Sequence, residues 1–125
     1  MNLIVNHVPV SKKCRPGTKM TPTSITIHST GNPDSYASGE RKWLENASND
    51  RTASWHYVVD ESQVIEAIPP TEVAWHAGND IGNKTSIGIE ICETGDRSKV
   101  LANAKELALH LMRKYKIEKM VRHFD

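Results

Sequence analysis

Three short strand-like segments of this sequence each supply a side chain suited to metal or proton chemistry: His28, Glu90 and His123. An ionisable group buried in an apolar setting costs on the order of several kcal/mol unless a metal ion or a partner charge compensates it. Three such groups in one small chain are therefore evidence about the function of the protein. Two imidazoles and one carboxylate delivered in this way indicate a hydrolytic site.

Zinc is the metal that this set of side chains favours. A hydrolytic zinc keeps three protein ligands and leaves its fourth position to water, whose pKa falls to about 7 on binding. Two histidines and one further ligand would suffice for such a site. A nearby carboxylate can accept a proton from the water and later deliver it to the leaving amine, and Glu90 is the candidate for this role.

The elements that must position these residues follow from apolar periodicity. Ile25 and Ile27 alternate with Thr26 and His28, which predicts a strand over 23–28 that ends near His28. Further strands are predicted at 3–10, 53–59, 63–68, 86–92 and 120–123, with 53–59 and 63–68 forming a hairpin. Helices are predicted over 39–48, capped by Ser38, and from Ser98 to Tyr115, while 71–85 is expected to be a long irregular loop.

Length and element order predict the fold class. At 125 residues the chain is the size of one domain. Because strands and helices interleave, with one hairpin among them, we expect an α/β fold: a single domain over 1–125 with a mixed central β-sheet and helices packed on its faces. His28, Glu90 and His123 all fall at or near the carboxyl ends of their strands, where active sites of such folds collect.

Composition excludes several classes of partner. The formal net charge is +1, so the chain does not have the excess of basic residues that is typical of a nucleic-acid binder. Cys14 and Cys92 have no CxxC spacing, so a zinc knuckle or a redox pair is not supported. No segment approaches the roughly 20 apolar residues of a transmembrane helix, and we expect no membrane insertion. The start has no secretory signal pattern, which predicts synthesis in the cytoplasm.

Five segments together resemble a known family. They read ITIHST (25–30), ASWHYVVD (53–60), AWHAGN (74–79), SIGIE (86–90) and VRHFD (121–125). In this order they resemble the zinc-dependent N-acetylmuramoyl-L-alanine amidases of type 2, a family that includes phage endolysins, bacterial autolysins and the fold of peptidoglycan-recognition proteins. Each segment alone is a weak match, and their combination is specific.

The resemblance implies a role for each candidate residue. His28 and His123 would bind Zn2+, and Glu90 would act as general base and acid. The groove for the glycan-linked stem peptide would be lined by His56, Trp75, His76 and Asn79. The bond cut would join the lactyl carbonyl of N-acetylmuramic acid to L-alanine in bacterial peptidoglycan.

One position of the family's pattern is missing. The family's third zinc ligand is a Cys or Asp several residues beyond the second metal histidine, and this sequence ends two residues after His123. We therefore expect an amidase catalytic domain truncated at its C-terminal end, or one that completes the metal shell with water, with Asp125 or with a neighbouring molecule. A cell-wall-binding domain could follow it in the natural gene. The resemblance predicts action on the cell wall after release at lysis.

Other interpretations remain open at this stage. A peptidoglycan-binding module of the same fold could lack turnover because the third ligand is missing, and a hydrolase acting on free muropeptides is a further possibility. The same residues also have structural interpretations. His28 could be a core histidine, Glu90 could end its strand at the surface, and His123 could be exposed near a terminus. His56 and Trp75 could serve packing, and His76 could lie exposed in a loop.

Overall fold

The fold is the predicted α/β class, a mixed β-sheet with helices packed on its faces. The computed structural model describes residues 1–11, 13–49 and 51–122. Within these residues the strands are β1 (Leu3–Val5), β2 (Ser24–Ser29), β3 (Tyr57–Val59), β4 (Val64–Glu66), β5 (Ser86–Ile91) and β6 (Lys119–Arg122). The helices are α1 (Ala37–Glu45), α2 (Asp80–Thr85) and α3 (Arg97–Tyr115).

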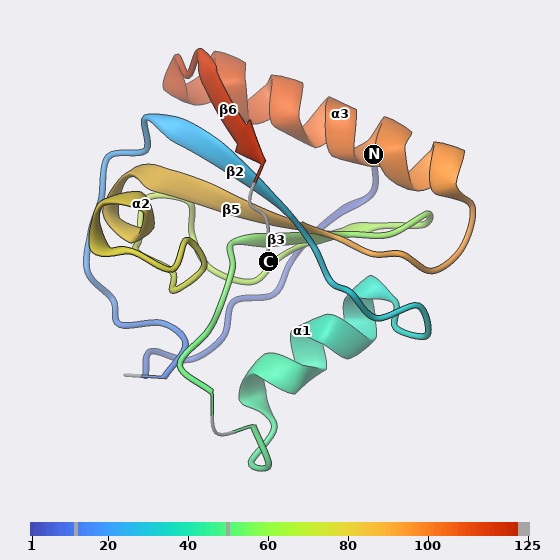
Figure 1. Cartoon of the computed structure of the whole chain (residues 1–125), viewed down its shortest axis with the longest axis horizontal. Coiled ribbons are helices and arrows are strands. Elements are labelled where there is room, and N and C mark those ends of the chain that lie inside the picture. The colour runs from blue at the N-terminus through green and yellow to red at the C-terminus, as the bar shows by residue number, and fades with distance from the viewer. Residues whose placement is uncertain (12, 50, 123–125) are drawn as a thin grey trace.

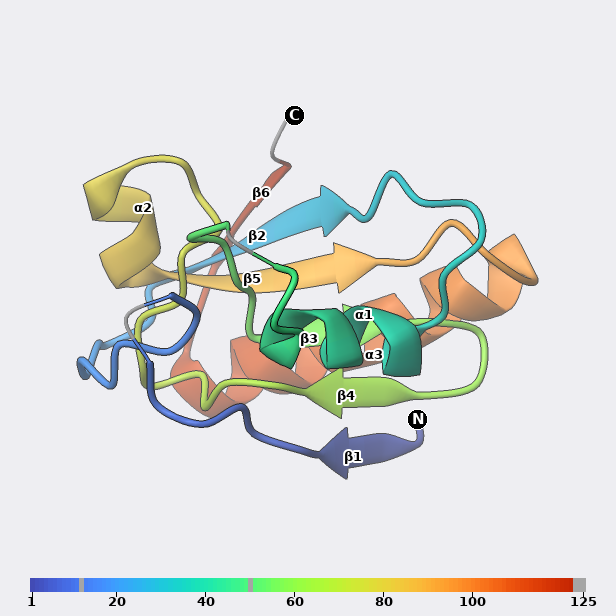
Figure 2. The ribbon, with the colours of Figure 1, turned by 90° about the horizontal axis from the view of Figure 1, so that it is seen from below.

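The six strands lie in the order β1-β4-β3-β5-β2-β6 (Figure 2). All neighbours are parallel except β3 and β4, which form the predicted antiparallel hairpin. The two strands that carry His28 and Glu90, β2 and β5, are therefore adjacent and parallel near the centre of the sheet. Their carboxyl ends lie at the same edge.

Helices cover the sheet on both faces, with α3 on one side and α1 on the other (Figure 1). The isoleucines of β5 alternate along the strand toward α3, where they pack with Leu107 and Leu111. Full burial of such a side chain is worth about 1.5–3 kcal/mol. This apolar layer fixes the register of β5, because a slip by one residue would turn every isoleucine to the opposite face.

The face toward α1 combines apolar packing with polar side chains. Val58 and Ile65 pack there with Ala37 and Leu44 of α1. The residues of β2 and β5 that share this face alternate with the isoleucines: Ser24, Thr26, His28, Ser86, Gly88 and Glu90. The candidate site is therefore built on the polar stripe of a sheet whose reverse side is a hydrophobic core.

Several element predictions need correction. Helix α1 begins at Ala37, so Ser38 lies in its first turn and does not cap it. The Ala37 N–H instead donates to the Asp60 carboxylate at 2.9 Å, a contact across 23 positions of sequence that local patterns cannot reveal. The predicted loop 71–85 contains helix α2 at its end. Strand β1 spans three residues of the predicted eight.

Among the described residues, no helix has both the length and the apolar character needed to cross a membrane.

Candidate active site

His28 and Glu90 lie side by side at the centre of the site. They are register partners on β2 and β5, and adjacent parallel strands direct such partners to the same face. Neighbouring strands are about 4.8 Å apart. His28 is 4% exposed, and Oε2 of Glu90 is buried. The sheet therefore holds an imidazole and a carboxylate together in a partly desolvated setting.

A cleft of about 460 Å³ opens above this pair. We call it the His28 cleft; its lining includes His28, Glu40, Trp43, Asn49, Arg51, Trp55, Trp75, His76 and Glu90. Trp75 and His76, both predicted to contact substrate, therefore do lie at the cleft. Their segment is held to the core because the backbone N–H of Trp75 donates a hydrogen bond to the Ser54 hydroxyl at 3.0 Å.

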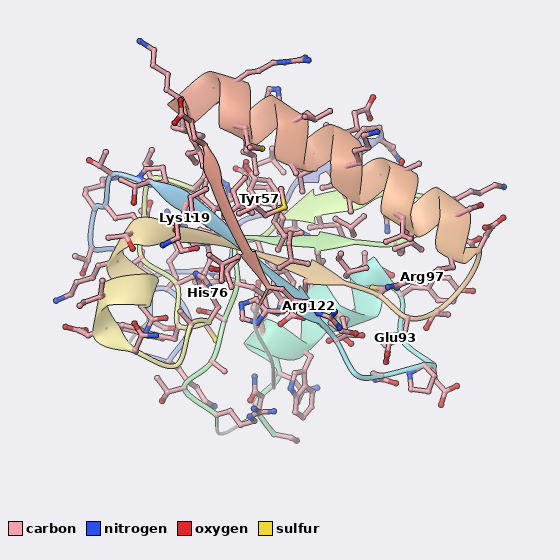
Figure 3. All side chains as sticks on the ribbon, turned by 45° about the horizontal axis from the view of Figure 1, so that its top comes forward. Tyr57, His76, Glu93, Arg97, Lys119 and Arg122 are labelled. Atoms are coloured by element: carbon pink, nitrogen blue, oxygen red, sulfur yellow. The ribbon has the colours of Figure 1, made fainter. Side chains whose placement is uncertain are left out.

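His76 lies across the sheet over Gly88 (Figure 3 shows it beside α2). A Cβ on Gly88 would meet Cγ of the His76 ring at 2.6 Å, so only glycine leaves room for the ring there. The Nε2 atom of His76 is 2.9 Å from the carbonyl oxygen of Ser86, and Nδ1 is 3.1 Å from Nε2 of His28. His76 thus connects β5 to His28.

His56, predicted to line the substrate groove, is not among the described lining residues of the cleft. Its side chain has no exposed surface. One ring nitrogen donates to the carbonyl oxygen of Glu72 at 2.7 Å, and the other accepts the N–H of Gly88 at 2.9 Å. Burial lowers the pKa of His56 to about 4, so the ring is neutral at physiological pH. We assign it a structural role beneath the cleft floor.

Asn79 also lies outside the described lining of the cleft. Its side-chain oxygen accepts the N–H of Gly82 at 2.7 Å, and its amide donates to the carbonyl oxygen of Ala77 at 3.2 Å. Asn79 is therefore the N-cap of α2, and both ends of its side-chain amide contact backbone groups. The Asn-Asp pair at 79–80 is a helix-start signal that could have predicted α2.

The donor chemistry of the cleft suits zinc, which prefers imidazole nitrogen and carboxylate oxygen. His123 lies outside the described residues, and within those residues no three His, Cys, Asp or Glu side chains form a group that could hold a metal ion. Both cysteines are buried, and burial raises the pKa of Cys92 to about 12. A protonated thiol is a poor metal ligand, and neither cysteine is in the described lining of the cleft, where His28, His76 and Glu90 carry donor atoms of the kinds that zinc binds.

Trp43, Asn49 and Arg51 are among the cleft residues that were missed as site candidates. Trp43 is on α1, and its side chain is 44% exposed. Asn49 and Arg51 follow α1 in a segment without a motif. The indole of Trp43 on a mostly polar helix surface was the one sequence signal for a binding role. Sequence alone does not show that α1 ends beside the sheet, so it could not place these residues at the cleft.

Comparison with known proteins gives the family. A family model described as N-acetylmuramoyl-L-alanine amidase matches residues 18–125. The chain belongs to this family. This amidase-family chain is 42% identical over 123 residues to N-acetylmuramoyl-L-alanine amidase XlyA of Bacillus subtilis (strain 168), which covers 94% of it. It is 41% identical over 119 residues to N-acetylmuramoyl-L-alanine amidase CwlH of the same organism.

Two solved structures have the same fold as this chain. The catalytic domain of XlyA superposes with a TM-score of 0.91 at 41% identity, covering 98% of this chain and 84% of that one. PlyL superposes with a TM-score of 0.82 at 34% identity, covering 96% and 80%. The chain spans 41% of the length of full XlyA and 47% of CwlH. The resemblance identified from the five segments is thereby confirmed.

Proposed function

We propose that this domain hydrolyses the amide bond between N-acetylmuramic acid and L-alanine in bacterial peptidoglycan, and that it depends on Zn2+. The observation that supports the proposal most strongly is the pairing of His28 with Glu90 at the floor of the His28 cleft. Membership in the amidase family agrees with it. The site of action in this proposal is the cell wall, where the substrate is found.

His28 and His123 are the residues that would hold the metal. When bound, zinc supplies Lewis acidity for the scissile carbonyl and for the attacking water. The role of His28 is to present an imidazole nitrogen from the end of a rigid strand. Its burial at 4% exposure limits the competition of bulk water for that nitrogen.

Glu90 would carry the protons. In this proposal its carboxylate accepts a proton from the attacking water and later delivers it to the nitrogen of the departing L-alanine. A carboxylate can perform both steps only if it lies within reach of both atoms, which its place beside His28 favours. Because Oε2 of Glu90 is buried, its electrostatic interaction with charge that develops during the reaction would be stronger than in water.

The remainder of the cleft would hold the substrate. Trp43 and Trp75 offer flat apolar surfaces to sugar rings and to aliphatic parts of the stem peptide. Arg51 provides a guanidinium at the lining, which suits a stem-peptide carboxylate. His76 lies at the wall of the cleft, and its two ring nitrogens are hydrogen-bonded to His28 and to Ser86.

The test is release of free amino termini from purified cell walls. We expect release by the zinc-loaded chain, loss of release with a chelator, and recovery when zinc is added back. The His28→Ala variant should be inactive, whereas His110→Ala, a change on the exposed side of α3, should retain activity. Equal release with and without chelator, or no release with zinc present, contradicts the proposal. Wall binding without release would instead support a binding module.

A further inference from the structure

The two ring nitrogens of His76 have different partners, and these partners determine where its proton lies. Nε2 is 2.9 Å from the carbonyl oxygen of Ser86. A carbonyl oxygen can only accept a hydrogen bond, so Nε2 of His76 carries the hydrogen. In the neutral ring Nδ1 then bears the lone pair and accepts a hydrogen bond.

The hydrogen bond that Nδ1 of His76 accepts comes from His28. Nε2 of His28 lies 3.1 Å from Nδ1 of His76, and the two rings meet edge to face at 88° with centroids 5.3 Å apart. With Nδ1 of His76 as acceptor, Nε2 of His28 must be the donor. The neutral His28 ring then has its lone pair on Nδ1. The two hydrogen bonds of His76, to Ser86 and to His28, therefore select one of the two tautomers of His28.

Packing holds His76 in the position that this selection requires. The ring occupies the space over Gly88, and His56 packs against it at a centroid distance of 5.6 Å. The backbone N–H groups of His76 and Ala77 both donate to Oδ1 of Asn83, at 3.0 and 2.8 Å. The ring is thus fixed from below by the sheet and along the chain by α2.

We propose that His76 is a positioning residue, which holds His28 in the tautomer with a hydrogen on Nε2 and directs Nδ1 to the metal. This inference rests on the proposed function, in which His28 binds zinc. It gives His76 a role that differs from substrate contact. Partners that orient a metal-binding histidine through its other ring nitrogen typically contribute about 10- to 100-fold to metal affinity.

Two substitutions separate this role from simple packing. His76→Asn places a side-chain oxygen near the original Nδ1 position and keeps an acceptor for His28. His76→Leu fills similar space and removes the acceptor. We expect His76→Leu to weaken zinc binding about 10- to 100-fold and His76→Asn to restore most of that loss. His110→Leu, on the exposed side of α3, is the matched histidine control and should bind zinc as the unaltered chain does.

The experiment has two readouts. Long-range 1H–15N correlation spectra of the metal-free chain report the tautomer of His28, and competition with a chromophoric chelator reports zinc affinity for each variant. The inference predicts a hydrogen on Nε2 of His28 without metal and a zinc-induced shift at Nδ1. A hydrogen on Nδ1, zinc attached to Nε2, or equal affinities for the Leu and Asn variants would overturn it.

These outcomes distinguish the inference from the proposed function. If zinc binds through Nε2 and the chain still releases amino termini from walls, the amidase proposal stands and the role of His76 is wrong. If the unaltered chain binds no zinc, the proposed function fails, and the directing of Nδ1 to the metal fails with it. The spectrum of the metal-free chain tests the tautomer in either case.

Discussion

At the residue scale, three histidines that were all predicted to belong to the site have three different surroundings. His28 lies at a strand end in the cleft, His76 crosses the sheet over Gly88, and His56 lies below with no exposed surface. Alternation along the strand predicted which way His28 faces. It could not predict the burial of His56, because the groups that enclose it, Glu72 and Gly88, come from other segments.

The burial of His56 makes a prediction about pH. Its pKa is about 4 in the folded chain against 6.5 for the free side chain, because burial penalises the charged ring. As pH falls below 6.5 the unfolded chain takes up a proton that the folded chain excludes, so stability is complete above pH 6.5 and declines toward pH 4. We expect the free energy of unfolding to fall by about 2 kcal/mol between pH 7.5 and 5 from this residue.

Denaturant unfolding at a series of pH values measures this decline, and NMR titration of the His56 ring provides the direct check. The acidic groups Glu66 and Glu72 and the ring of His76 are the neighbours that act on His56. A His56→Asn variant should show a shallower dependence over the same range. A His56 ring that titrates near pH 6.5 in the folded chain would contradict the account.

At the element scale, the sequence was most informative where periodicity and core packing agree. Strands β2 and β5 and helix α3 were predicted to within one or two residues, since their isoleucines and leucines form one core. Helix α1 was misplaced because its first N–H is satisfied by Asp60 from another element. Helix α2 was missed because six residues with no buried side chain leave no apolar stripe.

Strand β5 supplies a prediction of its own through Gly88. Gly88→Ala should displace the His76 ring, because the added carbon would lie 2.6 Å from Cγ and 2.8 Å from Nδ1 of that ring. We expect destabilisation of about 1–3 kcal/mol, as for other overpacked sites. The change should also break the His28–His76 hydrogen bond.

Thermal or denaturant unfolding gives the stability change, and the 15N resonances of His28 report the hydrogen bond. Gly31→Ala is an informative comparison, since no atom lies within 4 Å of its added carbon, although its φ of +68° adds backbone strain. Unchanged His28 resonances in Gly88→Ala would contradict the close packing described above.

At the scale of the whole molecule, one ion pair ties the long segment between β1 and β2 to the segment that carries the cleft wall. The Arg15 guanidinium donates to both carboxylate oxygens of Glu72 at 2.8 and 2.9 Å, and also to the carbonyl oxygen of Val8. The same interaction holds the pKa of Glu72 below its usual range. The Glu72 backbone in turn accepts the hydrogen bond of His56.

Arg15→Met should therefore lower the free energy of unfolding by about 3 kcal/mol, because it leaves a buried carboxylate without its bidentate partner. Lys19, whose amine is 3.6 Å from Glu72, would limit the loss. Arg15→Lys keeps the positive charge but removes the bidentate guanidinium. We therefore expect an intermediate loss in the free energy of unfolding. Denaturant unfolding of the three chains at neutral pH measures the series. A loss below about 0.5 kcal/mol in Arg15→Met would show that the ion pair is dispensable.

The family model matches residues 18–125, and the proposed function depends on one reaction at the His28 cleft. Mass spectrometry of the products from purified peptidoglycan tests it most directly, with Glu90→Gln as the matched control. We predict new L-alanine amino termini together with lactyl carboxylates on intact glycan strands. Glu90→Gln should slow the reaction about 10²- to 10⁴-fold. New reducing sugar ends, cleavage within the stem peptide, or full activity of Glu90→Gln would contradict it.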